Sequence, residues 1–314
     1  MKKEQLNNTV LNYATTIDLG IDLGNGYTKV NGLKFPSKVG TGSKISFNSD
    51  LGEVHNVNYD GGDYIVGDGA VFLGEQRYFS EKYKIALFTA IATACKGLPS
   101  PIGANICVGL PLNNYERNAT KLRKHLESLP VTSISVDGED YIIGITNVTV
   151  FPEGALGVIE EETVSVLTVD IGSGTINVVE WRGMTPVNET TIPKSMLNLN
   201  IKVRDYLNKR FNADVTKETV GEFVGKDFMK IAQQTTDISS HKSLISDFVG
   251  DVMGEIEAVF SVRSIEKIKL LGGGAILLHE YFQKIYPEVE LVKNAQFINS
   301  EVYQKVAELH RQTK

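Results

Sequence analysis

The sequence has few of the residues that mark disulfide-rich and metal-binding proteins. Cys95 and Cys107 are its only cysteines, too few for a disulfide framework and without the paired spacing of a zinc site. The five histidines include no HExxH pair. Metal binding through thiolate or imidazole is therefore not expected, and a reducing cytoplasm is the compartment that fits best.

Basic runs and long apolar runs are also missing. The formal net charge is −6 and no five lysines or arginines stand together, which argues against direct binding to DNA through its phosphates. Nowhere do 18 uncharged apolar residues run together, and no apolar stretch follows the two lysines of the N-terminal MKKEQLNNTVLNYATT. We expect a cytoplasmic protein without membrane attachment, whose work on DNA, if any, goes through a DNA-binding partner.

What is present is the pattern of an α/β protein. A chain of 314 residues can bury a sizeable core, and this length favours two domains. Short β-branched apolar runs alternate with helical ones, which predicts a largely parallel sheet. Strands are expected at residues 17–22, 104–109, 164–170, 176–181 and 267–271. Helices are expected around residues 83–91, 122–129, 220–228 and 244–259, and from residue 276 onward.

Two features describe how the chain is organised. Residues 34–75 are rich in glycine, aspartate and serine, with short alternating pieces, which indicates a small β-rich insertion. In addition, IDLGNG at 21–26 and VDIGSG at 169–174 repeat one pattern, each with a valine four residues later. The repeat predicts two related lobes, and a ligand held by both copies would lie between them.

The repeated pattern has a chemical meaning. An apolar strand ending in Asp-x-Gly-x-Gly places a carboxylate at the strand end, and the glycines that follow can turn with positive φ. Backbone N–H groups in such a turn can point at an anion. The same pattern also makes ordinary hairpin turns, so one copy alone supports either interpretation. Two copies favour phosphate binding.

The first copy contains a choice between two aspartates, because IDLG occurs twice in succession at 17–24. Asp22 is followed seven residues later by Lys29, which could meet a terminal phosphate as a point charge. Asp18 has Asn25 at that spacing and lacks the second glycine. Asp22 is therefore the expected chemical group, and Asp18 is expected to be a strand residue or a solvated edge.

A third glycine element, LLGGGA at 270–275, follows an apolar run and precedes a helical pattern. Glycines between a strand and a helix let a ligand lie against the backbone, and a helix N-terminus favours negative charge. A tight strand-to-helix turn without a ligand is the alternative. Neither GxGxxG nor GxxxxGK[ST] occurs, so the Rossmann and P-loop interpretations lose their main support.

In order and spacing, IDLGNGYTK, VDIGSGT and LLGGGA resemble the phosphate 1, phosphate 2 and adenosine motifs of the actin, sugar-kinase and heat-shock-chaperone ATPase superfamily. Within it, GLPLNNYE at 109–116, FPEG at 151–154 and the C-terminal NAQFINSEVYQKVAE are similar to segments of ParM-type bacterial actins, which segregate plasmids. The resemblance implies a two-lobed α/β actin-like ATPase fold, in which each lobe is a duplicated ribonuclease-H-like mixed sheet flanked by helices. The first lobe would span 1–153 with 294–314 returning to it, and the second 154–293.

The resemblance also implies residue roles. Glu153, Asp22 and Asp170 would be catalytic: Glu153 would orient or deprotonate the attacking water, and the two aspartates would face a Mg²⁺ ion, mostly through its waters. Glu153 has an alternative role as an acid at a helix N-terminus. The residues expected to hold the nucleotide are Gly24, Asn25, Gly26 and Lys29 in one lobe, Gly172, Ser173, Gly174 and Thr175 in the other, and Gly272, Gly273 and Gly274 beside the nucleoside.

The chain departs from the family pattern at two places. Ser173 stands where conventional actins have an aspartate after the phosphate 2 glycine. Near the C-terminus the sequence reads Asn299, Ser300, Glu301 where many ParM relatives have a glycine that supports a hinge between lobes. The hinge glycine is therefore absent here.

The function that the resemblance implies is an ATPase or GTPase that uses Mg²⁺ and forms nucleotide-dependent dynamic filaments with itself. Such a filament would segregate plasmid DNA through a DNA-binding adaptor on a plasmid centromere. A sugar or acetate-type kinase is one alternative, although Asp60 and Asp68 are the only candidates found for its base. A chaperone-like or cell-division regulatory ATPase is the other. Sedimentation with and without ATP separates these functions.

Overall fold

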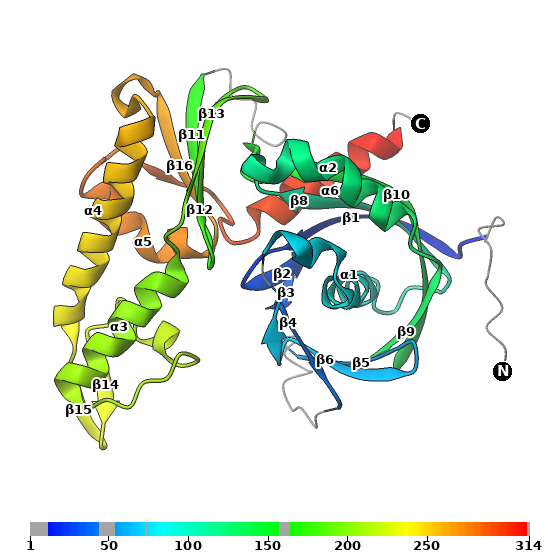
Figure 1. Cartoon of the computed structure of the whole chain (residues 1–314), viewed down its shortest axis with the longest axis horizontal. Coiled ribbons are helices and arrows are strands. Elements are labelled where there is room, and N and C mark those ends of the chain that lie inside the picture. Colours follow the sequence, from blue (N-terminus) through cyan, green and yellow to red (C-terminus); the bar gives the residue numbers. More distant parts are fainter. Residues whose placement is uncertain (1–11, 44–53, 73, 157–163, 313–314) are drawn as a thin grey trace. The chain divides into compact units, whose positions relative to one another are not determined.

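The computed structural model describes residues 12–43, 54–72, 74–156 and 164–312. The chain divides into two compact units: the first is Met1–Glu160 with Asn299–Lys314, and the second is Glu161–Ile298. Each unit is built on a sheet of its own, and the described residues form ten strands of the first sheet and five of the second (Figure 1).

The first unit's sheet has the order β3-β2-β1-β8-β10-β9-β5-β6-β4-β7. Its strands are β1 (Thr15–Leu23), β2 (Tyr27–Val30), β3 (Leu33–Pro36), β4 (Lys38–Thr41), β5 (His55–Tyr59), β6 (Gly62–Val66), β7 (Ala70–Val71), β8 (Ile102–Leu110), β9 (Thr132–Val136) and β10 (Glu139–Pro152). The parallel pairs β1–β8 and β8–β10 form its centre. Strand β8, IGANICVGL, is buried at almost every position, as expected for a parallel strand covered on both faces.

The insertion expected at residues 34–75 comprises strands β4 to β7, and it continues the same sheet. Strand β5 pairs antiparallel with β9, which joins the insertion to the central strands. The sheet curls around helix α1 (Glu81–Ala94), which contacts strands from both parts (Figure 1). Residues 44–53 and 73 of this segment lie outside the described residues.

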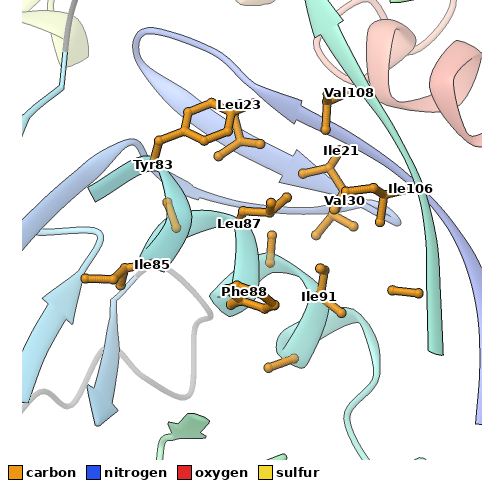
Figure 2. Packing of buried hydrophobic residues seen from close by; sticks show 14 of the residues in the cluster. Ile21, Leu23, Val30, Tyr83, Ile85, Leu87, Phe88, Ile91, Ile106 and Val108 are labelled. Carbon is orange, nitrogen blue, oxygen red and sulfur yellow. The ribbon is translucent and has the colours of Figure 1, made fainter. Parts of the chain in front are cut away.

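Helix α1 is the central core element of the first unit. Its N-cap is Ser80, whose Oγ accepts a hydrogen bond from the N–H of Tyr83 at 3.2 Å. From Tyr83 to Ala92 every residue but one is buried, which is the pattern of a helix enclosed on all sides. Figure 2 shows Leu87 and Ile91 pointing toward Ile21 and Val30 of strands β1 and β2. Strand β1, which ends at the first glycine turn, is thereby fixed against the core.

The described residues of the first unit also form three further helical segments: η2 (Glu75–Phe79), α2 (Leu112–Glu127) and α6 (Ile298–Gln312). Helix α6 lies directly on strands β1 and β8. A Cβ atom at Gly20 would stand 2.0 Å from the backbone nitrogen of Gln304, and one at Gly109 would stand 2.1 Å from the hydroxyl of Tyr303. A side chain at Gly20 would displace the helix backbone, and one at Gly109 would displace the side chain of Tyr303.

Asp18 has its role at this contact. Its side chain is buried in β1, accepts a hydrogen bond from Asn105 Nδ2 at 2.7 Å and pairs with Arg311 Nε at 3.1 Å. Gln304 donates to the backbone oxygen of Asp18 at 2.9 Å and accepts from the N–H of Gly20, also at 2.9 Å. The expectation of a strand residue is correct, but that of a solvated edge is wrong: helix α6 covers Asp18, and the carboxylate helps to hold that helix.

The second unit repeats the central plan of the first with the strand order β13-β12-β11-β16-β17. Its strands are β11 (Ser165–Ile171), β12 (Ile176–Arg182), β13 (Thr185–Ile192), β16 (Lys267–Leu271) and β17 (Glu290–Leu291). In both sheets the first strand has an antiparallel hairpin on one side and two parallel strands on the other. The predicted duplicated mixed sheet is therefore confirmed.

The remaining elements of the second unit are helical or form a small separate hairpin. They are α3 (Met196–Phe211), η4 (Val220–Glu222), β14 (Phe228–Ile231), β15 (Gln234–Asp237), η5 (Ser239–His241), α4 (Lys242–Val259), η6 (Val262–Ser264) and α5 (Gly273–Gln283). The predicted helix over residues 220–228 is wrong. Only one 3₁₀ turn forms there, because Gly225 adopts φ +81°, which ends the helical path, and Phe228 begins a strand.

Within the described residues, no helix is both long enough and apolar enough to cross a membrane.

Candidate functional site

The first glycine turn joins β1 to β2. The N–H of Gly24 donates to the carbonyl of Tyr27 at 3.1 Å, which closes the turn, and a Cβ at Gly24 would stand 3.0 Å from that carbonyl. The hairpin register places Lys29 directly opposite Asp22. Their side chains form an ion pair at 2.8 Å and are only 13% and 7% exposed. The seven-residue spacing seen in the sequence therefore brings the cation beside the carboxylate at the strand end.

The second glycine turn joins β11 to β12 with the same backbone pattern. The N–H of Gly172 donates to the carbonyl of Thr175 at 3.0 Å, and a Cβ at Gly172 would stand 2.9 Å from that carbonyl. Asp170 is buried at the strand end, like Asp22. The residue opposite it in the register is Asn177, which accepts a hydrogen bond from Thr191 Oγ1 at 3.1 Å. The second copy thus has a neutral amide where the first has a cation.

The triple glycine packs directly against the second turn. Asp170 and Leu271 are register partners in the parallel pair β11–β16, so both strands end together. Gly272 has φ +84°, and a Cβ there would stand 2.4 Å from Asp170 Oδ1. A Cβ at Gly274 would stand 2.5 Å from the side chain of Ile171. Only glycine fits at these two positions, so the motifs predicted to hold phosphate and nucleoside meet in one unit.

Helix N-termini also converge on the second turn. The first N–H groups of α3, at Met196 and Leu197, donate to the carbonyls of Gly172 and Ser173, each at 3.2 Å. Helix α5 begins at Gly273, and its N-cap Gly272 lies against Asp170, so the positive end of its dipole lies at this turn. The turn is therefore held by backbone groups and lies in a field that favours negative charge.

Glu153 follows the last residue of β10 in the first unit. Its N–H donates to the carbonyl of Leu110 at 3.0 Å, and the next N–H, of Gly154 with φ +79°, donates to Asn299 Oδ1 at 3.1 Å. The backbone on both sides of the carboxylate is thus fixed, by β8 and by the start of α6. The chain forms a turn at Glu153, and a helix beginning after residue 156 would lie outside the described residues.

Arg77 is a residue of this site that the sequence analysis missed. It lies in η2 with a side chain only 6% exposed, and its Nη1 donates to Asn25 Oδ1 of the first turn at 2.7 Å. Burial opposes the charge of Arg77, but the nearby Tyr78 and Glu153 outweigh this and raise the pKa of the guanidinium. Arg77 is therefore bonded to the first turn and lies within the electrostatic influence of Glu153. A single arginine without a partner at fixed spacing leaves no signal in a sequence.

The structure thus gathers the predicted site residues into two groups, one in each unit. The first group consists of Asp22, Gly24, Asn25, Gly26, Lys29 and Glu153, and Arg77 joins it. The second group consists of Asp170, Gly172, Ser173, Gly174, Thr175, Gly272, Gly273 and Gly274.

Both groups fit a magnesium nucleotide in their chemistry. Backbone N–H groups in glycine-rich turns can contact anions, and Lys29 and the amide of Asn25 are donors suited to phosphate oxygens. Mg²⁺ prefers carboxylate, phosphate and water oxygens and keeps several waters. Among the described residues, no group of three or more His, Cys, Asp or Glu side chains could hold a metal by itself. A metal bound here would need nucleotide and water as further ligands.

Comparisons with known proteins place this geometry in a family of folds. Residues 20–155 match the sequence model described as the N-terminal domain of actin-like proteins. The archaeal actin homologue Ta0583 superposes with a TM-score of 0.79 at 21% identity, covering 93% of this chain and 99% of its own. The chain has the actin-like fold. The predicted resemblance to the actin-like superfamily and the predicted fold class are both confirmed.

Two further structures with the actin-like fold bear on function. The complex of Ta0583 with ADP has a TM-score of 0.77 at 21% identity, with 93% and 99% of the two chains covered. A 15-stranded ParM filament from Clostridium botulinum has a TM-score of 0.76 at 18% identity, covering 94% and 99%. Filament-forming proteins are therefore among the structural neighbours of this chain. A search of curated protein sequences finds no match.

Proposed function

We propose that this chain is a nucleoside triphosphate hydrolase that forms filaments, and that its two glycine turns bind the phosphates of ATP or GTP with Mg²⁺. The observation that carries the proposal is the duplicated turn. In each sheet the last residue but one of the first strand is a buried aspartate, and the turn that follows makes the same glycine N–H to carbonyl bond, at 3.1 Å and 3.0 Å. A hairpin that only reverses the chain does not require an aspartate and two glycines at the same positions in both units, so the repeat favours a shared ligand.

Each of these residues would have its own role in phosphoryl transfer. Lys29 and the N–H groups of the two turns would hold the β and γ phosphates, and Asp22 and Asp170 would orient waters around the metal. Mg²⁺, when bound, would supply positive charge that neutralises the phosphate oxygens. Glu153 would orient the attacking water or accept its proton. In this chemistry, positioning and charge stabilisation account for most of the rate.

The self-association that we propose is supported by the actin-like fold and by the ParM filament among its structural neighbours. Nucleotide binding would favour assembly, and hydrolysis would weaken the filament. By extension from the ParM resemblance, the filament would move plasmid DNA in a bacterial cytoplasm through a DNA-binding adaptor. The acidic net charge of −6 supports the need for an adaptor. Purified protein should therefore not shift plain DNA at physiological salt, and a persistent mobility shift would remove the adaptor from the proposal.

Sedimentation tests the proposal against its rivals. The protein should pellet with Mg²⁺ and ATP or GTP and stay in solution without nucleotide. Phosphorylation of an added sugar or acetate would instead support the kinase. The two aspartates considered as the base of a kinase give that alternative little structural support. Asp60 stands in the exposed β5–β6 turn with φ +49°. The carboxylate of Asp68 accepts a hydrogen bond from the N–H of Gly69 in its own turn. Hydrolysis without pelleting or phosphorylation would leave the chaperone-like or cell-division ATPase.

A further inference from the structure

Arg77 is a buried cation that none of the assigned roles uses. Arg77 precedes α1, and its backbone is anchored at the start of that helix. The carbonyl of Arg77 accepts two hydrogen bonds from Ser80, one from the hydroxyl at 2.7 Å and one from the N–H at 3.0 Å. Ser80 is also the N-cap of α1, the most enclosed helix of the first unit. Arg77 therefore starts from a fixed position in the core.

The guanidinium is fixed at its other end as well. Nη2 donates to the hydroxyl of Tyr78 at 3.2 Å, and the guanidinium carbon stands 4.7 Å from the centre of the Tyr78 ring. Nη1 donates to Asn25 Oδ1 at 2.7 Å, a charge-assisted bond of short length. Removing a guanidinium from water is costly unless it is hydrogen-bonded, and this one is 6% exposed. Its direction toward Asn25 is therefore well determined.

This bond fixes which end of the Asn25 amide faces which way. Arginine only donates hydrogen bonds, so the atom of Asn25 that it meets has to be the oxygen. Because the amide is planar, the two N–H bonds of Nδ2 then lie on the side away from Arg77. Asn25 stands between Gly24 and Gly26 in the first turn, the turn whose N–H groups are proposed to face phosphate. An amide turned the other way would present an oxygen to an anion.

We propose that Arg77 is a positioning residue for nucleotide binding: it holds the Asn25 amide so that its N–H groups face the terminal phosphates. This role rests on the proposed function of the first turn. The consequence is selectivity. The binding affinity for a nucleoside di- or triphosphate should depend on Arg77. The affinity for a nucleoside monophosphate, whose single phosphate does not reach as far into the turn, should depend on Arg77 much less.

Two single variants separate this role from a merely structural one. Asn25→Asp keeps an oxygen for Arg77 but replaces the N–H groups by a second oxygen, so ATP affinity should fall about 10-fold or more while the melting temperature does not fall. Arg77→Lys keeps the charge but loses the planar fork that orients the amide, and ATP affinity should again fall about 10-fold. AMP affinity should change by no more than about twofold in either variant. Arg204→Lys, at an exposed pair with Asp205, is the matched control and should bind ATP like the parent.

The pair Asn25→Ala and Arg77→Lys completes the test. If Arg77 acts through the amide, it has nothing to orient once the amide is gone, so the double variant should bind ATP as weakly as Asn25→Ala alone. Losses that multiply in the double variant would show two independent contacts and overturn the positioning role. ATP affinity like that of the parent in Asn25→Asp and Arg77→Lys would also overturn it. A parent protein that bound no ATP at all would instead overturn the proposed function.

Discussion

The two glycine turns share one backbone pattern but differ in what surrounds them. The first is surrounded by charged side chains: the Asp22–Lys29 pair at 2.8 Å and the buried Arg77, with Glu153 nearby. The second has Asn177 at the register position of Lys29 and is held instead by α3 and α5.

Under the proposed function, the two turns would attract the same phosphates in two different ways. Side-chain cations supply full charges, but they need partners when they are buried. Helix N-termini supply partial charges that are part of the backbone and that a side-chain substitution does not remove. Side-chain variants should therefore affect the first turn more than the second, and the only proposed carboxylate for water activation, Glu153, lies in the unit of the first turn.

The largest effect is expected for Glu153→Ala. Loss of the carboxylate should slow hydrolysis by roughly 100-fold, on the order of 3 kcal/mol in the barrier, because the water is no longer oriented. ATP binding should hardly change, since Glu153 repels phosphate. The variant should therefore assemble with ATP and remain assembled long after the parent has come apart, as light scattering over time can show.

The control for this variant is Glu222→Ala, at an exposed position of the second unit. It should hydrolyse and disassemble like the parent. Parental phosphate release by Glu153→Ala, together with rapid disassembly, would assign the water to another residue and reduce Glu153 to a structural acid.

The next largest effect is expected for Lys29→Asn, which gives the first turn the residue that the second turn has at the matched position. Asp22 would lose its cation while remaining buried, which should lower the free energy of unfolding by about 3 kcal/mol. ATP affinity should fall by about 10-fold or more. Urea denaturation and equilibrium nucleotide binding measure the two effects. Unchanged affinity would mean that the two turns do not differ in the way described.

Smaller and equal effects are expected for Gly24→Ala and Gly172→Ala. The added Cβ atoms would stand 3.0 Å and 2.9 Å from the carbonyls of Tyr27 and Thr175, so each turn has to open slightly. Each variant should lose about 1 kcal/mol of folding free energy, and the two losses should agree within about 0.5 kcal/mol. Thermal or urea unfolding checks this. A clearly larger loss at one turn would show that the backbones are not equivalent.

The parts of this site that could be predicted from the sequence are those specified by neighbouring residues. Asp22 and Lys29 are seven apart and therefore meet across a short hairpin, and Gly272 follows an apolar strand directly. The helix expected at 220–228 failed for a local reason too: its apolar spacing is helical, but Gly225 takes a left-handed conformation that ends the helix.

The parts that could not be predicted depend on contacts distant in sequence. From the sequence, Asp18 is expected to be a strand residue or a solvated edge. Its burial could not be predicted, because the helix that covers it begins far along the chain, at Ile298. Arg77 carries no spacing signal, and only the packing of η2 and α1 against the first turn buries it beside Asn25. A burial pattern decided by tertiary structure leaves little trace in one sequence.

The central claim is that both turns hold the phosphates of the same nucleotide, and calorimetric titration of the protein with ATP and Mg²⁺ tests it most directly. The account predicts one bound nucleotide per chain and strongly weakened binding in both Asp22→Ala and Asp170→Ala, because each removes a carboxylate that orients water around the metal. Asp18→Asn, in the same strand as Asp22 but at the α6 contact, should bind like the parent. Two bound nucleotides per chain, or parental binding by either alanine variant, would contradict the claim.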